Sequence, residues 1–491
     1  MIQWAPSTSD GADGAMRLAH YEALANVPFD QGYVRHHDAA ALLDELFFQR
    51  AVQTYLWALP ALSMYAMKEG AERAFGDGYH VMPVFKERIN ARTLITTPSS
   101  DLIYAFAFLD LKRDGPLVLE VPAGLQGVID DFWQRPVPSV GVIDGRRWSG
   151  AVGHAGPDRG KGGAYLLLPP DYTGRIPAGY HVYRSGTYGV FAFWRAHFAD
   201  PTNLSEPVRL LERTRIYPLG MRPRATRMEF PNASAVPIDM LYPQDGSAFA
   251  LLARFLDREY VDPADREMRG MAAAIGIARA SAFAPDERRT ALLDRAARTA
   301  TRIGHVIAHT PSLHSSAGRY YPDRQYVDSF PANATFAGES LNYLDARTGF
   351  FTYAYSSNPA MPMKPEAVGG KYPSVFTDAN GEFLSGDRQY RLHLPANIPA
   401  ARFWSVTVYD ALTGAGLDNG QPFPSINTMD RPLQNADGSL DIYFGATSPG
   451  QDKNWLATVP GKGWFAIIRL YEPLRAFFDQ SWRPDDIVRL S

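Results

Sequence analysis

One passage of this sequence occurs twice, and the repetition constrains the fold more than any other feature. Gly189–Arg195 reads GVFAFWR and Gly463–Arg469 reads GWFAIIR. A Phe-Trp pair precedes each copy at a similar distance, at Phe132-Trp133 and at Phe403-Trp404. Self-similarity at this spacing predicts two domains of one fold, related by duplication and joined by a different segment.

Composition supports a β-rich protein and excludes several classes. The 491 residues allow two or three domains, and 25 Tyr, 27 Phe and 9 Trp with 38 Pro and 41 Gly favour strands and turns. A net charge of −3 gives no electrostatic sign of nucleic-acid binding. Because there is no cysteine, disulfides, thiolate nucleophiles and Cys-based metal sites are excluded.

The beginning of the chain shows no targeting signal. Residues 1–30 have neither a basic start nor an apolar core, so we expect no signal peptide. A cytoplasmic location fits the chain as written, and a periplasmic location stays open for a mature form. The most apolar stretch, Tyr55–Met67, is too short to span a bilayer and contains Pro60.

Periodicity divides the chain into strand-rich and helix-rich parts. Residues 40–70 have apolar side chains at helical spacing, and Pro60 should kink or divide this helix. Further helices are expected at 207–213, 247–259, 265–282 and 286–309. Strands are expected at 103–109, 117–121, 164–168, 182–183, 190–198, 349–355, 390–394, 403–409, 440–444 and 464–470.

The expected fold class is therefore α+β and β-rich. It has two antiparallel, jelly-roll-like β-sandwich domains related by duplication, a helical insert and an N-terminal helical segment. Residues 1–39 form an irregular N-terminal segment, and residues 40–204 hold the N-terminal helix and the first sandwich. Residues 205–337 form a mainly helical insert, and residues 338–491 form the second sandwich.

Arg195 and Arg469 each interrupt a run that otherwise predicts a buried strand. A buried guanidinium must be paired or hydrogen-bonded, because leaving it alone costs several kcal/mol. One interpretation is a clamp for an anionic ligand. The other is a structural ion pair with a carboxylate of the same sheet, such as Asp110, Glu120 or Asp410.

Hydroxyls and carboxylates gather in two places, one before an expected strand and one within a strand. In the segment Thr97–Tyr104, Asp101 and Tyr104 form a general acid/base pair if they line a cleft. The alternative is a turn in which Ser and Asp bind nearby backbone. Asp130 and Asp131 are adjacent in a strand, so at most one of them serves a site.

Three segments should meet in one pocket at the seam between the two sandwiches. They are Thr97–Tyr104, Arg184–Tyr188 and Arg319–Tyr321, each with polar or phenolic groups at the mouth of a strand. In this arrangement Arg184 or Arg195 clamps an anion. The candidate catalytic residues are Asp101, Tyr104, Arg184, Arg195 and Tyr320.

The histidines give an alternative site. His305 and His309 stand at i and i+4 on one helical face, which suits metal ligation, and His314 follows. No HExxH glutamate accompanies them, and surface or capping histidines are the commoner explanation. The sequence thus requires no cofactor, with a divalent metal as the alternative.

Several motifs resemble a bacterial family that pairs the domain of unknown function 1254 with the domain of unknown function 1214. They are Leu46–Pro60, Thr97–Asp101 and Gly115–Glu120 for the first domain, and Phe403–Asp410, Asn435–Ser439, Asn454-Trp455 and Arg469–Tyr471 for the second. The resemblance covers nearly the whole chain beyond residue 40. It implies two β-sandwich domains with helices between them, and it implies little about a reaction.

Two functions remain open at this point. The first is an enzyme of hydrolase or lyase type that acts on a small organic molecule at an inter-domain cleft. The second is a non-catalytic ligand- or carbohydrate-binding protein. Titratable groups that converge in a pocket favour the first, and an aromatic groove without them favours the second. The expected partner is a small-molecule ligand, without nucleic acid or a membrane span, and a homo-oligomer stays open.

Overall fold

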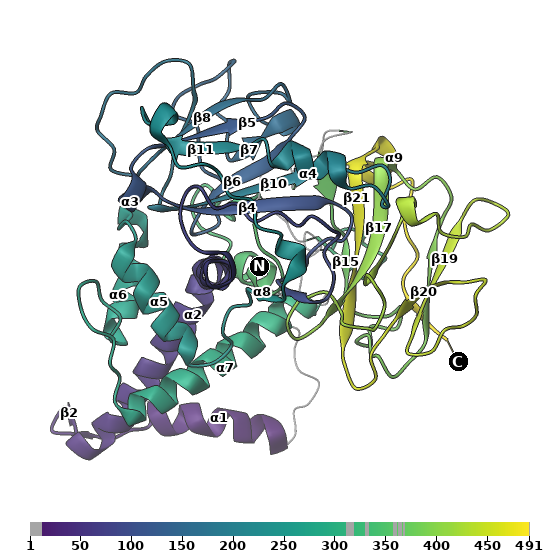
Figure 1. Cartoon of the computed structure of the whole chain (residues 1–491). Coiled ribbons are helices and arrows are strands. Elements are labelled where there is room, and N and C mark those ends of the chain that lie inside the picture. The colour runs from purple at the N-terminus through teal and green to yellow at the C-terminus, as the bar shows by residue number, and fades with distance from the viewer. Residues whose placement is uncertain are drawn as a thin grey trace.

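Two strand-rich units and a layer of helices make up the structure, a computed structural model that describes residues 12–310, 319–328, 333–356, 361, 366 and 369–490. In Figure 1 the first β unit lies at the top and the second at the right, and the long helices lie below the first and to the left of the second. The helices therefore contact both β units. None of the helices in these ranges combines the length and apolar character needed to cross a bilayer.

The first β unit consists of two four-stranded sheets, ordered β4-β10-β6-β7 and β11-β5-β8-β9. The strands are β4 (Ile103–Asp110), β5 (Leu117–Val121), β6 (Gln126–Asp131), β7 (Ala151–Val152), β8 (Gly163–Leu168), β9 (His181–Arg184), β10 (Gly189–Ala196) and β11 (Arg215–Pro218). Side chains from both sheets form one buried cluster. In β4 the odd-numbered residues from Ile103 to Leu109 belong to it. The even-numbered residues from Tyr104 to Phe108 belong to a cluster shared with the helices, so β4 is buried on both faces.

The second β unit is built in a similar way. One sheet has the order β13-β15-β21-β17-β18, with β14 also paired to β21, and the other has the order β20-β19-β16-β22. The strands are β13 (Tyr326–Val327), β14 (Gly370–Lys371), β15 (Ser374–Val375), β16 (Tyr390–Leu394), β17 (Ala400–Asp410), β18 (Ser425–Asn427), β19 (Leu440–Gly445), β20 (Asn454–Ala457), β21 (Trp464–Pro473) and β22 (Val488–Arg489). In β21 the even-numbered residues from Trp464 to Leu470 pack between the sheets. Phe465, Ile467 and Tyr471 pack toward the helices.

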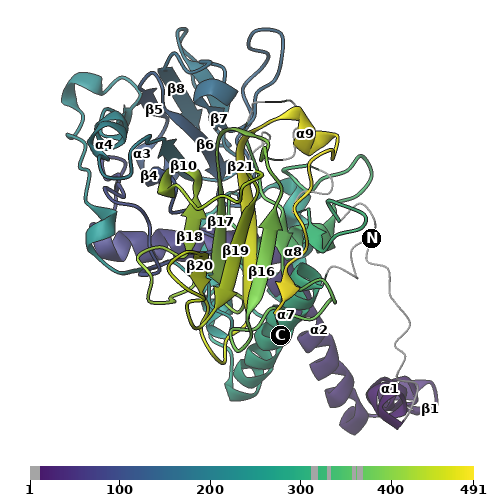
Figure 2. The same ribbon diagram turned by 90° about the vertical axis from the view of Figure 1, so that its right-hand side faces the viewer.

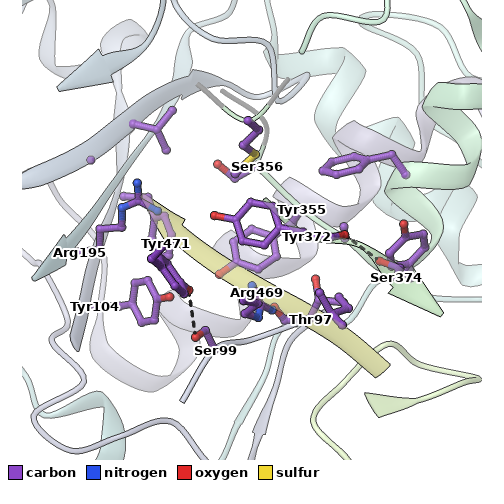
Figure 3. A pocket seen from close by; sticks show the side chains of 18 residues that line it. Thr97, Ser99, Tyr104, Arg195, Tyr355, Ser356, Tyr372, Ser374, Arg469 and Tyr471 are labelled. Atoms are coloured by element: carbon purple, nitrogen blue, oxygen red, sulfur yellow. Dashed lines mark hydrogen bonds between the residues drawn. The ribbon is translucent and has the colours of Figure 1, made fainter. Parts of the chain in front are cut away.

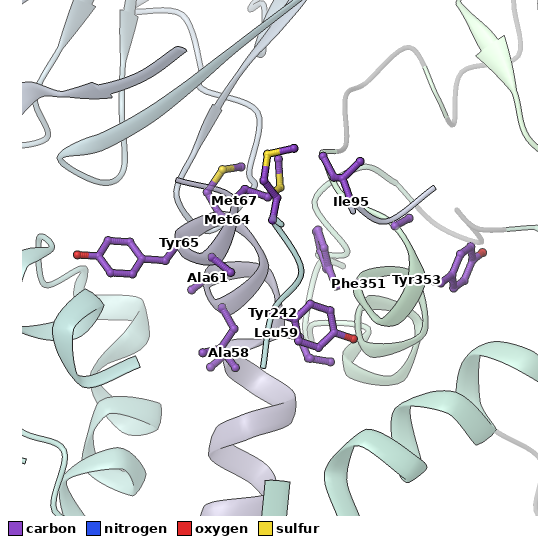
Figure 4. Packing of buried hydrophobic residues seen from close by; sticks show 14 of the residues in the cluster. Ala58, Leu59, Ala61, Met64, Tyr65, Met67, Ile95, Tyr242, Phe351 and Tyr353 are labelled. Atoms are coloured by element: carbon purple, nitrogen blue, oxygen red, sulfur yellow. The ribbon is translucent and has the colours of Figure 1, made fainter. Parts of the chain in front are cut away.

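The helical layer is organised around α2 (His36–Phe75), which is buried from Ala51 to Ala71 apart from a few positions. It packs against α5 (Ser247–Arg258), α6 (Arg266–Ala274), α7 (Glu287–His309) and α8 (Leu344–Tyr353). Figure 4 shows Ala58, Leu59 and Met64 of α2 in this core, with Phe351 of α8 and Tyr242 nearby. Small and flexible apolar side chains at the middle of α2 allow several helices to approach it.

The remaining helices are short or peripheral. They are α1 (Ala12–Ala25), α3 (Leu111–Asp114), α4 (Ser205–Leu211) and α9 (Arg475–Phe478). The segment expected to be irregular thus contains α1, followed by a short hairpin of β1 (Phe29–Asp30) and β2 (Tyr33–Val34). In Figure 2 α1 and β1 stand away from the β units. A last small sheet pairs β3 (Thr93–Leu94) with β12 (Ile238–Asp239).

Most predicted elements are confirmed, with three exceptions. The helix expected at 265–282 ends at Ala274, and Gly276 with a φ of 95° follows it. The expected strand at 349–355 is wrong, because residues 344–353 form α8. Its aromatic run GFFTYAY has strand-like composition, but burial against α7 and α2 favours a helix there. The helix expected at 40–70 is longer, and Pro60 does not divide it in two. Packing around this buried segment outweighs the backbone hydrogen bond that proline removes.

The strands are not purely antiparallel, contrary to expectation. β8 pairs with β9 and β19 pairs with β20 in parallel, because the intervening chain crosses over before it returns to the sheet. The Phe-Trp pairs also differ in position. Trp133 lies beyond the end of β6, whereas Trp404 lies inside β17. They are therefore not equivalent points of a repeat, and the duplication and the jelly-roll strand order stay predictions.

Candidate functional site

A cavity lies where the two β units and α8 meet, and Figure 3 shows its walls. Its volume is about 110 Å³, against the roughly 10–15 Å³ that one water molecule requires. It can therefore hold several waters or one small organic molecule. The first unit contributes side chains of β4, β6 and β10, and the second contributes side chains of β15 and β21.

Strand alternation brings both suspected arginines into this cavity. Arg195 of β10 stands on the face opposite Trp194, and Arg469 of β21 stands on the face opposite Ile468 and Leu470. Both arginines line the cavity, one from each β unit. The register places Arg195 beside Tyr104 of β4.

Neither arginine has a carboxylate partner in the part of the chain that the structure describes. The three carboxylates considered from the sequence are bound elsewhere. Asp110 pairs with Arg258, Glu120 pairs with Arg222, and Asp410 pairs with Lys462. The interpretation of Arg195 and Arg469 as partners of these carboxylates is therefore wrong.

Arg469 is instead held by oxygens that carry no formal charge. Its Nη2 donates to Tyr409 Oη at 2.5 Å and to the backbone oxygen of Thr97 at 2.9 Å. Its Nε is buried and has no hydrogen-bond partner among the described residues. Burial opposes the charged form, but the phenols of Tyr409, Tyr471 and Tyr104 raise the pKa of Arg469 well above its usual value. The guanidinium stays charged and keeps a donor unused.

Tyrosines provide most of the other polar groups of the cavity. Tyr104, Tyr355, Tyr372 and Tyr471 all line it, and the Tyr104 ring stacks on Phe193 with centroids 5.0 Å apart. Burial raises the pKa of Tyr104, Tyr355 and Tyr471. These phenols are therefore protonated at neutral pH and can donate hydrogen bonds to a ligand.

Asp101 lies one side chain behind the wall of this cavity. It is completely buried and accepts hydrogen bonds from Asn427 Nδ2 at 2.8 Å and Ser425 Oγ at 3.3 Å. Its other oxygen accepts from Ser99 Oγ at 3.1 Å. Ser99 Oγ is also 3.4 Å from Tyr471 Oη, the contact dashed in Figure 3. Asp101 thus reaches the cavity only through Ser99.

The other segments expected to converge do not line the cavity. The guanidinium of Arg184 donates to the backbone oxygens of Tyr172 at 2.9 Å and Pro169 at 3.3 Å. Tyr320 stacks on Phe477 with ring centroids 4.5 Å apart and packs against the core of the second β unit. Of the three predicted segments, only Thr97–Tyr104 contributes to the walls.

The histidine pair lies apart from this cavity, near the end of α7. The rings of His305 and His309 are 4.9 Å apart, and His309 stacks on Phe376. Burial lowers the pKa of both rings, that of His309 to about 3. His314 lies outside the described residues. Within those residues, no three His, Cys, Asp or Glu side chains are grouped so that they could hold a metal ion.

Sequence analysis missed the residues that follow α8. Tyr355 and Ser356 line the cavity, as does Tyr372. The available signal for the tyrosines was the Tyr-Ala-Tyr run at 353–355, which places phenols beside a buried element. Because this run was assigned to a strand of the second unit, its position at the seam was not apparent.

Comparisons with known proteins agree with this architecture. A family model described as a protein of unknown function, DUF1254, matches residues 81–218, which span the first β unit. Another, DUF1214, matches residues 369–475 in the second. No curated protein matches the sequence.

Two solved structures are similar over most of the chain. The VPA0106 protein from Vibrio parahaemolyticus has 17% identity and a TM-score of 0.52, and the match covers 91% of this chain and 100% of that one. An uncharacterized protein from Burkholderia cenocepacia has 13% identity and a TM-score of 0.41, with 98% and 99% covered. At 17% identity, the match to the VPA0106 protein supports a similar fold and says nothing about function. Through its two matched regions, in that order, the chain belongs to the family of proteins that pair DUF1254 with DUF1214.

Proposed function

We propose that this protein is an enzyme of lyase or hydrolase type that acts on a small organic anion bound in the seam cavity. One observation carries the proposal. Arg195 and Arg469 line the same cavity and form no ion pair with a carboxylate of the described residues. A buried guanidinium without a counter-ion is unfavourable, so a carboxylate or similar anion would complete the site.

The contact chain behind Tyr471 supports acid–base chemistry. If Ser99 Oγ donates to Asp101, its remaining lone pair can accept the proton of Tyr471. A proton could then move from Tyr471 through Ser99 to the carboxylate of Asp101. Such a path would let Tyr471 take a proton from a ligand, a step used in eliminations and in water activation.

A non-catalytic binding protein is the second candidate, and the tyrosines favour it. Burial raises the pKa of Tyr104, Tyr355 and Tyr471, so these phenols keep their protons at neutral pH. They are therefore available as hydrogen-bond donors rather than as bases. Two charged arginines suit an anion better than a neutral sugar. The ligand proposed for this second candidate is therefore also a small organic anion.

Binding is tested by isothermal titration with acetate, pentanoate, succinate and benzoate. We expect at least one of them to bind, and Arg195→Met or Arg469→Met to weaken it about tenfold to a hundredfold, because each removes a charge-assisted hydrogen bond. Arg222→Met is the matched control, since its exposed guanidinium pairs with Glu120 away from the cavity. If none of the four binds, or if the control weakens binding equally, the anion site is refuted.

Catalysis is tested by incubating the protein with a mixture of small organic acids and following them by mass spectrometry. An enzyme should consume at least one acid, and Ser99→Ala and Tyr471→Phe should slow that consumption while binding is retained. A ligand that binds and is recovered unchanged would favour the non-catalytic candidate.

A further inference from the structure

Ser356 is held at the cavity wall in an unusual conformation by residues of the first β unit. Its backbone φ is 54°, in the left-handed region that residues other than glycine seldom adopt. Its backbone N–H donates to Gln134 Oε1 at 2.6 Å, and its Oγ lies 2.8 Å from Asp130 Oδ2. Gln134 is itself fixed, because its Nε2 donates to the backbone oxygen of Pro60 at 2.7 Å.

Backbone strain of this kind persists only where the surroundings enforce it, and it concentrates at functional sites. Here the surroundings place a hydroxyl group where it lines the cavity, since Ser356 is one of its wall residues. The result of this strain is a serine hydroxyl held at a fixed point on the wall of the cavity that the two arginines also line.

Asp130 lies directly behind this hydroxyl. It is completely buried in β6, on the same face of the strand as Val128, which lines the cavity. Its Oδ1 has no hydrogen-bond partner among the described residues. The adjacent Asp131 points to the other face, where it caps the turn through the backbone N–H groups of Trp133 and Arg135. Asp130 thus contacts a residue of the cavity wall, whereas Asp131 stabilises the turn.

Burial raises the pKa of Asp130 well above its usual value, with Asp131 adding to the effect. A neutral carboxyl group can donate its own O–H to Ser356 Oγ. The hydroxyl hydrogen of Ser356 is then free to point into the cavity. In Figure 3 Ser356 lies on one side of the Tyr355 and Tyr372 rings, and Arg469 lies on the other.

We propose that Ser356, backed by Asp130, recognises a second, uncharged oxygen of the ligand, so that the ligand is a short carboxylate that also carries a carbonyl or hydroxyl oxygen. This inference rests on the proposed anion site, because the arginines hold the carboxylate. The aromatic walls contributed by Phe193 and Phe350 surround the carbon chain between the two polar ends.

A matched pair of probes tests this recognition. Pentanoate and 4-oxopentanoate have the same charge and chain length and differ by one carbonyl oxygen. We expect the protein to bind 4-oxopentanoate about tenfold more tightly, which is the effect of one additional hydrogen bond. Ser356→Gly should abolish this preference and leave the affinity for pentanoate unchanged. Glycine also accepts a φ of 54° without strain, so the variant should fold.

Two further variants separate the roles of the pair. Ser374→Ala is the control, since this wall serine donates to the backbone oxygen of Tyr372, and its removal should leave the preference intact. Asp130→Asn should keep the preference, because an amide N–H can replace the neutral carboxyl O–H, whereas Asp130→Leu should lose it.

The outcomes distinguish this inference from the function on which it rests. Equal affinity of the unaltered protein for both probes would overturn the inference and leave the anion site standing. A preference that survives Ser356→Gly would also overturn it. If neither probe binds although acetate, succinate or benzoate does, the inference falls and the anion site stands. If none of these carboxylates binds, the anion site itself fails, and the inference falls with it.

Discussion

His309 shows how burial decides the charge of a single side chain in this protein. Its ring is stacked on Phe376 with centroids 4.5 Å apart, and burial together with His305 lowers its pKa to about 3. His197, beside Phe403 and Tyr471, also has a pKa of about 3, because burial and the charges of Arg195 and Arg402 oppose protonation. Both imidazoles are neutral at pH 7.

This neutrality gives a prediction about stability and pH. The folded pKa of His309 is far below the value of about 6.5 in the unfolded chain. The unfolded state therefore binds more protons between these values, and stability that is present above pH 6.5 is lost as the pH falls toward 3. His309→Phe should remove this loss. Between pH 7 and pH 5, the free energy of unfolding of the unaltered protein should therefore fall by about 2 kcal/mol more than that of the variant.

Urea unfolding at pH 5, 6 and 7 measures this difference. The comparison of the two proteins cancels the contributions of other groups to the pH dependence of stability. Glu259, whose pKa burial raises to about 7, is one such group and acts in the opposite direction. His154→Phe, at an exposed position, is the control. Parallel pH dependence in the His309→Phe variant and the unaltered protein would show that the ring does not resist protonation.

The residues of the site differ in how far sequence could identify them. Arg195, Arg469 and Tyr104 could be found because a charged or phenolic group in an apolar strand requires an explanation. Ser356 could not, because its position depends on Asp130 and Gln134, more than 200 positions earlier in the chain. Local pattern contains no information about such a contact.

At the scale of elements, short runs rich in aromatic and β-branched residues were the most reliable signal of strands. β5 begins and ends where expected, and β4, β10 and β21 lie within a few residues of their predicted bounds. β4, β10 and β21 are largely apolar on both faces because one face packs on a second sheet and the other packs in the cluster that includes the helices. The parallel pairing of β8 with β9 was not predictable, because strand order depends on tertiary contacts that composition does not report.

Close packing of α2 against β12 gives a prediction at this scale. A Cβ at Gly70 of α2 would lie 2.1 Å from the backbone oxygen of Asp239, which cannot move aside easily. Gly70→Ala should therefore lower the free energy of unfolding by about 1–3 kcal/mol. Gly270→Ala in α6 is the matched control, because the same substitution meets open space there. It should be neutral or stabilise by about 0.5–1 kcal/mol.

Thermal and urea unfolding of both glycine variants provide the measurement. A neutral Gly70→Ala would mean that α2 and β12 can separate without cost. A strongly destabilising Gly270→Ala would mean that α6 tolerates no added methyl group, and the comparison would then say nothing specific about α2.

Across the whole molecule, the segment before β4 joins the two β units. Asn427 and Ser425 of the second unit bind Asp101, and Tyr409 Oη donates to the backbone oxygen of Pro98 at 2.7 Å. Arg88 pairs with Asp430 at 3.0 Å. One hydrophobic cluster also includes side chains of β4, β21 and the helices. The units are therefore not independent bodies.

From this continuity we predict a single unfolding transition in differential scanning calorimetry, with calorimetric and van't Hoff enthalpies in agreement. Two domains joined by a linker would instead give two transitions. Asp101→Ala should lower the melting temperature of the whole transition, because it leaves buried amide and hydroxyl groups of the second unit without their acceptor. A second, separate peak in this variant would show that the units can unfold independently.

The position of Arg469 in the chain has a consequence for the newly made protein. The cavity closes only when β21, the last strand along the sequence to line it, joins β17. Domains tend to fold in the order of their synthesis. A ribosome that has completed β4, β6 and β10 has therefore made only one side of the cavity. A small organic acid that binds the cavity would stabilise the completed protein, but it could not stabilise the partly synthesised chain, in which the cavity has not yet formed.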